Sequence, residues 1–169
     1  MSFSLTTGNF DVQGSINKFI VENLLTNKPD WTNDLPINFD YPNQPLVFPS
    51  FSVTHLPSNE VQRYGGDGVG GGNKGVLETA IADISCWVDS TNAQDYQMKL
   101  RQMVDMVKKL FRQNVDIPIL GLYSSVTAPS QTGYIVKVRS IRETPSSPDP
   151  NPAIKRVRIL VSYNWVQRF

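Results

Sequence analysis

The run from Tyr64 to Gly75, YGGDGVGGGNKG, constrains the fold most, because seven of the eleven residues after Tyr64 are glycine. Glycine weakens both helices and strand interiors, so the run belongs to neither. A run of this density indicates either backbone amides that approach a phosphate or a long loop between ordered elements. The flanking residues distinguish the two.

The residues around Lys74 argue against a phosphate-binding loop. That motif needs Gly-Lys followed by Ser or Thr and then a helix, whereas here the lysine precedes another glycine and a strand pattern. Gly66, Gly68 and Gly71 match the dinucleotide fingerprint GxGxxG, but no helix pattern follows them. We therefore interpret residues 64–75 as a glycine-rich hairpin loop that binds no cofactor.

Two apolar stripes at helical spacing predict helices. The first spans residues 15–27, where Ser15 is placed to cap the first turn. The second spans residues 92–113, with Thr91 and Asn92 as candidate N-caps. At 1.5 Å per residue the second helix is about 33 Å long. It is therefore the dominant helix of the expected fold.

Alternating apolar residues predict strands in five places, at 47–56, 80–88, 120–127, 134–143 and 157–165. Small side chains on one face of the second strand leave room for the long helix.

Three segments are expected to lie outside the core. Residues 1–13 are polar and are predicted to form an arm. Residues 29–46 hold four prolines and should run as an extended connection, since they cannot pair as a central strand. Residues 144–152, TPSSPDPNP, hold four prolines in nine residues and are predicted to form an exposed hairpin loop.

The length of 169 residues favours one domain, residues 1–169. The order of the expected elements predicts an α+β fold. In it, an antiparallel or mixed sheet of about five strands is packed on one face by the N-terminal helix and one long central helix.

Few residues offer catalytic or metal-binding chemistry. His55 is the only histidine and Cys86 the only cysteine, which is too few ligands for a usual zinc site. We interpret Cys86 as a buried side chain in a protein from a reduced compartment. Asp83 is expected on a solvent or interface face, with a functional acid as the alternative. The chain is therefore not expected to be an enzyme, and no metal site is predicted.

The charge balance gives no global attraction to nucleic acid or to an anionic membrane, since the formal net charge is +1. Neither a signal peptide nor an apolar run of about 18 residues is present, so we expect a soluble protein made in the cytoplasm. Two basic pairs, Lys137 with Arg139 and Arg156 with Arg158, alternate on strand faces. They could bind phosphate or an acidic protein surface. With no stacking aromatic expected on that face, we favour a solvated or subunit-contacting surface.

Four segments resemble the tail terminator, or tail completion, proteins of tailed bacteriophages. They are SINKFIVENLL, LPINFDYPNQPLVFPSFSVTHL, ETAIADISCWVDSTNAQDYQMKLRQMVDMVKKLF and RVRILVSYNWVQRF. Together they cover about half of the chain, and the resemblance is one of pattern and size rather than of fixed letters.

The resemblance implies a virion protein that forms a hexameric ring on the last ring of the tail tube and ends its polymerisation. Its partners would be further copies of itself, the tail tube protein, a neck or connector protein and possibly the tail sheath. DNA would at most pass through the ring lumen, and no membrane is involved. A head-to-tail connector or neck adaptor and, in another class, a nucleic-acid-binding module are the alternatives. The candidate assembly contacts are Tyr64, Gly68, Gly70, Lys74, Pro148, Pro150, Arg156 and Arg158.

Overall fold

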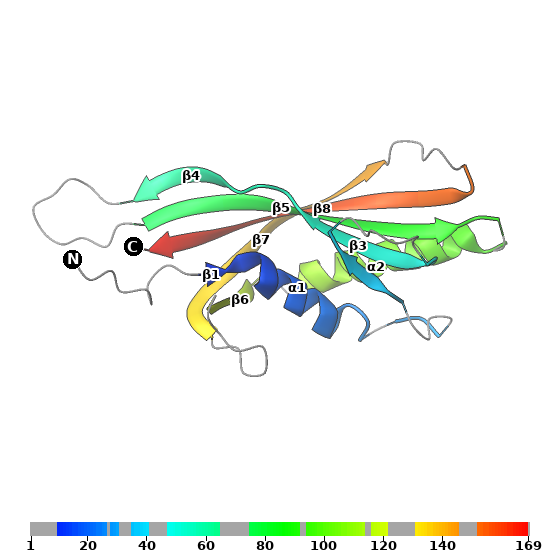
Figure 1. The fold of residues 1–169 in the computed structure, drawn as a ribbon, viewed down its shortest axis with the longest axis horizontal. Helices are drawn as coiled ribbons and strands as arrows, with labels where there is room; N and C mark the ends of the chain where they lie inside the picture. Colours follow the sequence, from blue (N-terminus) through cyan, green and yellow to red (C-terminus); the bar gives the residue numbers. More distant parts are fainter. Residues whose placement is uncertain are drawn as a thin grey trace, which may run out of the picture.

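Two long antiparallel strands form the centre of the fold. The computed structural model describes residues 10–26, 28–30, 35–40, 47–64, 75–91, 94–113, 116–121, 131–145 and 152–168. Strands β5 (Gly75–Asp89) and β8 (Ile154–Arg168) pair along their whole fifteen-residue lengths, from Gly75 opposite Arg168 to Asp89 opposite Ile154. Figure 1 shows this ladder running across the length of the molecule. All other elements are arranged around it in one domain.

Eight strands are present among the described residues, in the order β1-β6-β7-β8-β5-β3-β2, with β4 paired to β5 beside β3. Among these described strands only β2 and β3 pair in parallel, so the sheet is mixed. The α+β class is thus confirmed, whereas the expectation of about five strands is wrong. The remaining strands are β1 (Phe10–Asp11), β2 (Ile37–Phe39), β3 (Ser50–His55), β4 (Asn59–Tyr64), β6 (Asp116–Gly121) and β7 (Gln131–Pro145).

Strand β7 curls the sheet, because its two halves have different neighbours. From Lys137 to Pro145 it pairs with β8, and from Gln131 to Lys137 it pairs with β6. A register shift between Val138 and Ser140 marks the bend, as expected of a β-bulge. The curl is visible where β7 sweeps away beneath β5 and β8 in Figure 1.

Helix α1 (Val12–Asn23) begins three residues before the predicted position, because Asp11 caps it. The Asp11 carboxylate accepts a hydrogen bond from the Gly14 amide at 2.8 Å, which satisfies a free N–H of the first turn. Ser15, the expected cap, instead donates to the Asp11 carbonyl and accepts from the Leu120 amide at 2.8 Å. It therefore ties α1 to β6.

Helix α2 (Tyr96–Gln113) buries the predicted apolar stripe but begins four residues later than expected. Thr91, a candidate cap, is bonded to the Asp89 carboxylate instead, and Asn92 lies outside the described residues. The buried positions are Met103, Val104, Met106, Val107, Leu110 and Phe111. Neither described helix is long and apolar enough to cross a membrane.

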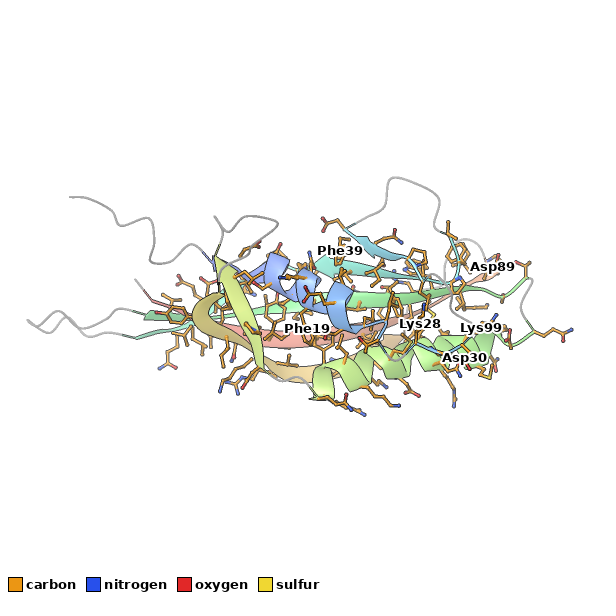
Figure 2. The ribbon with its side chains drawn as sticks, turned by 90° about the horizontal axis from the view of Figure 1, so that it is seen from below. Phe19, Lys28, Asp30, Phe39, Asp89 and Lys99 are labelled. Atoms are coloured by element: carbon orange, nitrogen blue, oxygen red, sulfur yellow. The ribbon has the colours of Figure 1, made fainter. Side chains whose placement is uncertain are left out.

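The helices lie on the same side of the sheet but against different strands (Figure 2). Helix α2 packs on β5 and β8, while α1 packs mainly on β6. This arrangement differs from the expectation that both helices cover the central sheet. Phe19 of α1 and Phe111 of α2 join the helices, with ring centroids 5.9 Å apart.

The core lies between the two helices and the inner face of the sheet, since Ile16 and Ile20 of α1 belong to it together with the buried residues of α2. On β5 the alternating residues Ala80, Ala82, Ile84, Cys86 and Val88 are all buried, which confirms the predicted inner face. Ile159, Val161 and Tyr163 of β8 continue this layer. Small side chains on β5 allow α2 to approach closely, as the sequence predicts.

Several expected boundaries need correction. The N-terminal arm was predicted to extend to residue 13, which is too far. Phe10 and Asp11 already pair with β6, and Val12 is buried. The connection 29–46 contains β2, which pairs at the edge of the sheet rather than centrally. Strands β7 and β8 are longer than predicted, so Thr144 and Pro145 belong to β7.

Candidate assembly surfaces

The glycine-rich and proline-rich segments are attached at opposite ends of the β5–β8 ladder. Tyr64 pairs with Gly75 where the glycine-rich segment begins and ends, and Gly75 pairs with Arg168. Pro145 and Ile154, which flank the proline-rich segment, lie at the other end, where Ile154 pairs with Asp89. Fifteen residues of strand separate the two ends by about 46 Å at 3.3 Å per residue.

Five of the predicted contacts, Gly68, Gly70, Lys74, Pro148 and Pro150, lie outside the described residues. The structure does place their attachment points. At one end, β4 and β5 flank the glycine-rich segment and pair as the two arms of a hairpin. A hairpin was predicted here, but β4 was not predicted as a strand. At the other end Ser90 bonds the Ala153 carbonyl through its amide at 2.7 Å and its hydroxyl at 2.8 Å. This pair of bonds fixes the start of β8.

Arg156 lies on the outer face of the sheet, opposite the helices, where it contacts Trp87 and Ser85. Its guanidinium lies 4.6 Å from the centre of the Trp87 ring, within the range of a cation–π interaction. Its Nε and Nη2 donate to Ser85 Oγ at 3.0 and 2.9 Å. Trp87 in turn donates to Ser52 Oγ at 2.9 Å. The expectation that no aromatic shares this face is therefore wrong.

Arg158 binds Asp83 through a two-pronged ion pair on the same face. The Asp83 side chain is only 8 % exposed, so of the expected solvent or interface face the solvent-facing carboxylate is wrong, while the interface stays a prediction. Because β5 and β8 are far apart in the sequence, only their pairing register brings the two together. We name Ser52, Asp83, Ser85, Trp87, Arg156 and Arg158 the outer-face cluster.

The outer-face cluster explains why polar residues are buried on the side of the sheet without helices. Ser52, Asp83 and Ser85 are all less than a tenth exposed. The arginine and tryptophan side chains lie across them and supply their hydrogen-bond partners. The cluster therefore gives this face a fixed, polar surface in place of a second layer of helices.

His55 joins the sheet to α1. Its Nε2 lies 2.6 Å from Asn17 Oδ1, and its Nδ1 lies 3.3 Å from the Tyr163 hydroxyl. Since a carbonyl oxygen only accepts, Nε2 carries the proton of the neutral ring and Nδ1 accepts from Tyr163. Burial lowers the pKa of His55, while Asp40 and Asp11 oppose this shift. Burial also raises the pKa of Tyr163 to about 12. The arrangement positions α1 through neutral hydrogen bonds.

The other reactive groups of the described residues have structural surroundings. Cys86 is fully buried, as predicted, and burial raises the pKa of its thiol, so it is a poor nucleophile. No group of three or more His, Cys, Asp or Glu side chains that could hold a metal ion occurs in the described part of the chain.

The sequence analysis gave no role to two participants in the outer-face cluster, Ser85 and Trp87, although it places them on the same strand face as Asp83. Their spacing was available as a signal, since Asp83, Ser85 and Trp87 alternate on the face of β5 opposite Ala82 and Ile84. What the sequence did not show is that Arg156 and Arg158 lie beside them.

Comparison with protein-family models finds no match, and comparison with curated proteins finds none either. Among solved structures, the chain is similar to a protein whose name gives no indication of its role. The two share 16 % identity and a TM-score of 0.48, over 92 % of this chain and 96 % of the other. Likeness at this level supports no inference about function.

Proposed function

We propose that this chain is a structural ring protein of a bacteriophage tail, of the tail terminator kind. In this role it closes the head-proximal end of the tail tube and joins it to the neck. The observation that supports the proposal is the two-ended geometry of the β5–β8 ladder. A subunit between tube and neck must contact one partner at each end, and the two loop-bearing ends are about 46 Å apart at 3.3 Å per residue.

The outer-face cluster also suits a structural role better than nucleic-acid binding. Arg156 and Arg158 form one of the two basic pairs on which the nucleic-acid alternative depends, the other being Lys137 with Arg139. Arg156 and Arg158 are both bound within the chain, to Ser85 and Trp87 and to Asp83. An arginine already paired with a carboxylate has less charge to offer to phosphates.

The test is to mix the purified protein with tail tubes and with tail-less heads and to image the products by electron microscopy. We expect rings that cap one end of each tube. Capping of tubes identifies a terminator, while binding to heads alone identifies the neck-adaptor alternative. If the protein binds neither tubes nor heads but is retained on DNA, and this retention falls steeply with salt, the nucleic-acid alternative is identified.

Two matched deletions test the two-ended geometry. One shortens the glycine-rich segment by removing residues 68–72, and the other shortens the proline-rich segment by removing residues 147–150. Each leaves the paired strand ends in place, so both variants should fold and form rings. We expect each to lose binding to a different partner. Loss of the same partner in both variants, or of neither, would refute the two-ended role.

A further inference from the structure

Three strands extend beyond the helices at the glycine-rich end of the molecule (Figure 1). They are residues 59–64 of β4, 75–79 of β5 and 164–168 of β8, which we call the strand extension. Pairing runs across all three, since Gln62 lies opposite Leu77 and Leu77 opposite Val166. The strand extension is thus a three-stranded ribbon with β5 in the middle.

Both edges of this ribbon are open in the part of the chain that the structure describes. Among the described strands, β4 is paired with β5 and with no other. On the other side β7 leaves β8 at Asn164 and turns to β6. Among the described residues, no strand therefore lies beside residues 165–168 of β8 on the side away from β5.

An open strand edge offers a row of backbone N–H and C=O groups that another strand can pair with. Proteins protect such edges with proline, with very short strands or with bulges. Strand β4 has six residues and no proline, and its one protective feature is the register shift at Val61; residues 59–60 and 62–64 stay in regular pairing with β5. Val61 itself is 59 % exposed. An exposed valine on this edge favours burial against a partner.

The two open edges complement each other within one chain. They lie at the same level of the ribbon, because Asn59 to Tyr64 and Asn164 to Arg168 are opposite the same residues of β5. Both strands run antiparallel to β5 and so run in the same direction as each other. A second copy with its strands in the same direction, tilted so that its β3 clears β7 of the first, would bring its β4 alongside residues 165–168 of β8 as a parallel pair.

We propose that copies of this chain join head to tail through the strand extension, with residues 165–168 of one copy pairing with β4 of the next. Such a contact uses two different surfaces, so repetition with a closing rotation generates a ring. The inference rests on the proposed ring function and adds the surface that forms the ring.

The test uses chemical cross-linking between the two edges. Gln62→Cys and Val166→Cys place one thiol on each edge, in the same row across the ribbon. The native Cys86 is buried and does not interfere. With a short, flexible thiol cross-linker, the double variant should give a ladder of covalent multimers that ends at the ring size. Each single variant, which has a thiol on only one edge, should stay uncross-linked.

The outcomes separate the inference from the proposed function. If sedimentation velocity detects oligomers of ring size but no cross-linked ladder forms, the edge pairing is overturned and the ring function stands. Dimers from either single variant would overturn the head-to-tail arrangement. Wild-type protein that neither forms rings nor caps tubes would overturn the proposed function itself.

Val61→Lys gives a second measurement that does not depend on cysteine geometry. A charge on the edge should weaken self-association by on the order of tenfold or more, equivalent to about 1.4 kcal/mol. Val21→Lys on α1 and Met98→Lys on α2 are matched controls, since these side chains are 53 % and 50 % exposed. If the controls weaken self-association equally, or if Val61→Lys does not weaken it, pairing through the edge of β4 is contradicted. Thermal melts by circular dichroism establish that each variant is folded.

Discussion

Arg158 holds Asp83 in place on the face of the sheet without helices. The Arg158 Nε lies 2.9 Å from Asp83 Oδ2, and Ser85 Oγ lies 3.4 Å from Asp83 Oδ1. The carboxylate is 8 % exposed and the arginine 32 %. Because the carboxylate is buried and the arginine partly exposed, the two residues should respond differently to substitution.

Removing the arginine should be the costly change. Arg158→Met leaves a buried carboxylate without its cation, and we expect a loss of roughly 2 to 3 kcal/mol in the free energy of unfolding. This is below the loss for a fully buried pair, because solvent screens part of Arg158. The double variant Asp83→Leu with Arg158→Met should recover most of the loss. Urea unfolding of both, with the exposed Arg139→Met as control, measures the difference. A double variant no more stable than Arg158→Met would show that the charge is not the cause.

The cap of α1 leads to a coupled prediction at Gly14. A Cβ at this position would lie 2.1 Å from the Asp11 carboxylate that caps the helix. Gly14→Ala should therefore displace the cap, and the gain of about 1 kcal/mol from helix propensity should be lost. In an Asp11→Ala background the same change should stabilise the protein by about 0.5 to 1 kcal/mol. Thermal unfolding of the wild type, the two single variants and the double variant measures the coupling between Asp11 and Gly14. If Gly14→Ala has the same effect in both backgrounds, displacement of the Asp11 cap is not its cause.

The elements with strong local patterns were predictable from the sequence. The alternation from Ala80 to Val88 gave the buried face of β5, and the stripe from Tyr96 to Phe111 gave α2. In both cases one face of the element is buried against a neighbouring layer, and the spacing of apolar residues in the sequence indicates that face.

The elements that depend on distant partners were not predictable. Strand β4, NEVQRY, has no apolar alternation and becomes a strand by pairing with β5. The start of α1 was misplaced because Asp11 caps the helix in place of Ser15, whose hydroxyl accepts from the amide of the distant Leu120. The partners of Arg156 and Arg158 depend on the register between β5 and β8. The candidate contact loops were visible in composition, but their separation at two ends of one ladder required the fold.

The contact between the two helices should contribute strongly to stability. Phe111 is 1 % exposed and its ring packs on Phe19. Phe111→Ala should lower the free energy of unfolding by about 3 to 5 kcal/mol, through lost burial and the cavity left behind. The neighbouring Arg112 is exposed, so Arg112→Ala should change it by less than about 0.5 kcal/mol. Denaturant unfolding measures both changes from the shift in midpoint, with the slope of unfolding free energy against denaturant concentration unchanged. Similar values for the two variants would mean that the helix contact is not part of the stable core.

The buried His55 makes stability depend on pH. Because burial lowers its pKa in the folded protein, protonation favours the unfolded chain, whose histidine has its ordinary pKa of about 6.5. The contribution of the neutral ring is therefore fully present above about pH 6.5 and is lost as the pH falls through the folded-state pKa. Over that window the free energy of unfolding should decrease by up to about 1.4 kcal/mol per pH unit. His55→Gln should remove this pH dependence of the unfolding free energy. Tyr163→Phe leaves the buried His55 imidazole in place and should retain it. Unfolding titrations between pH 5 and 8 compare the three proteins, and an unchanged slope in His55→Gln would assign the pH dependence to other groups.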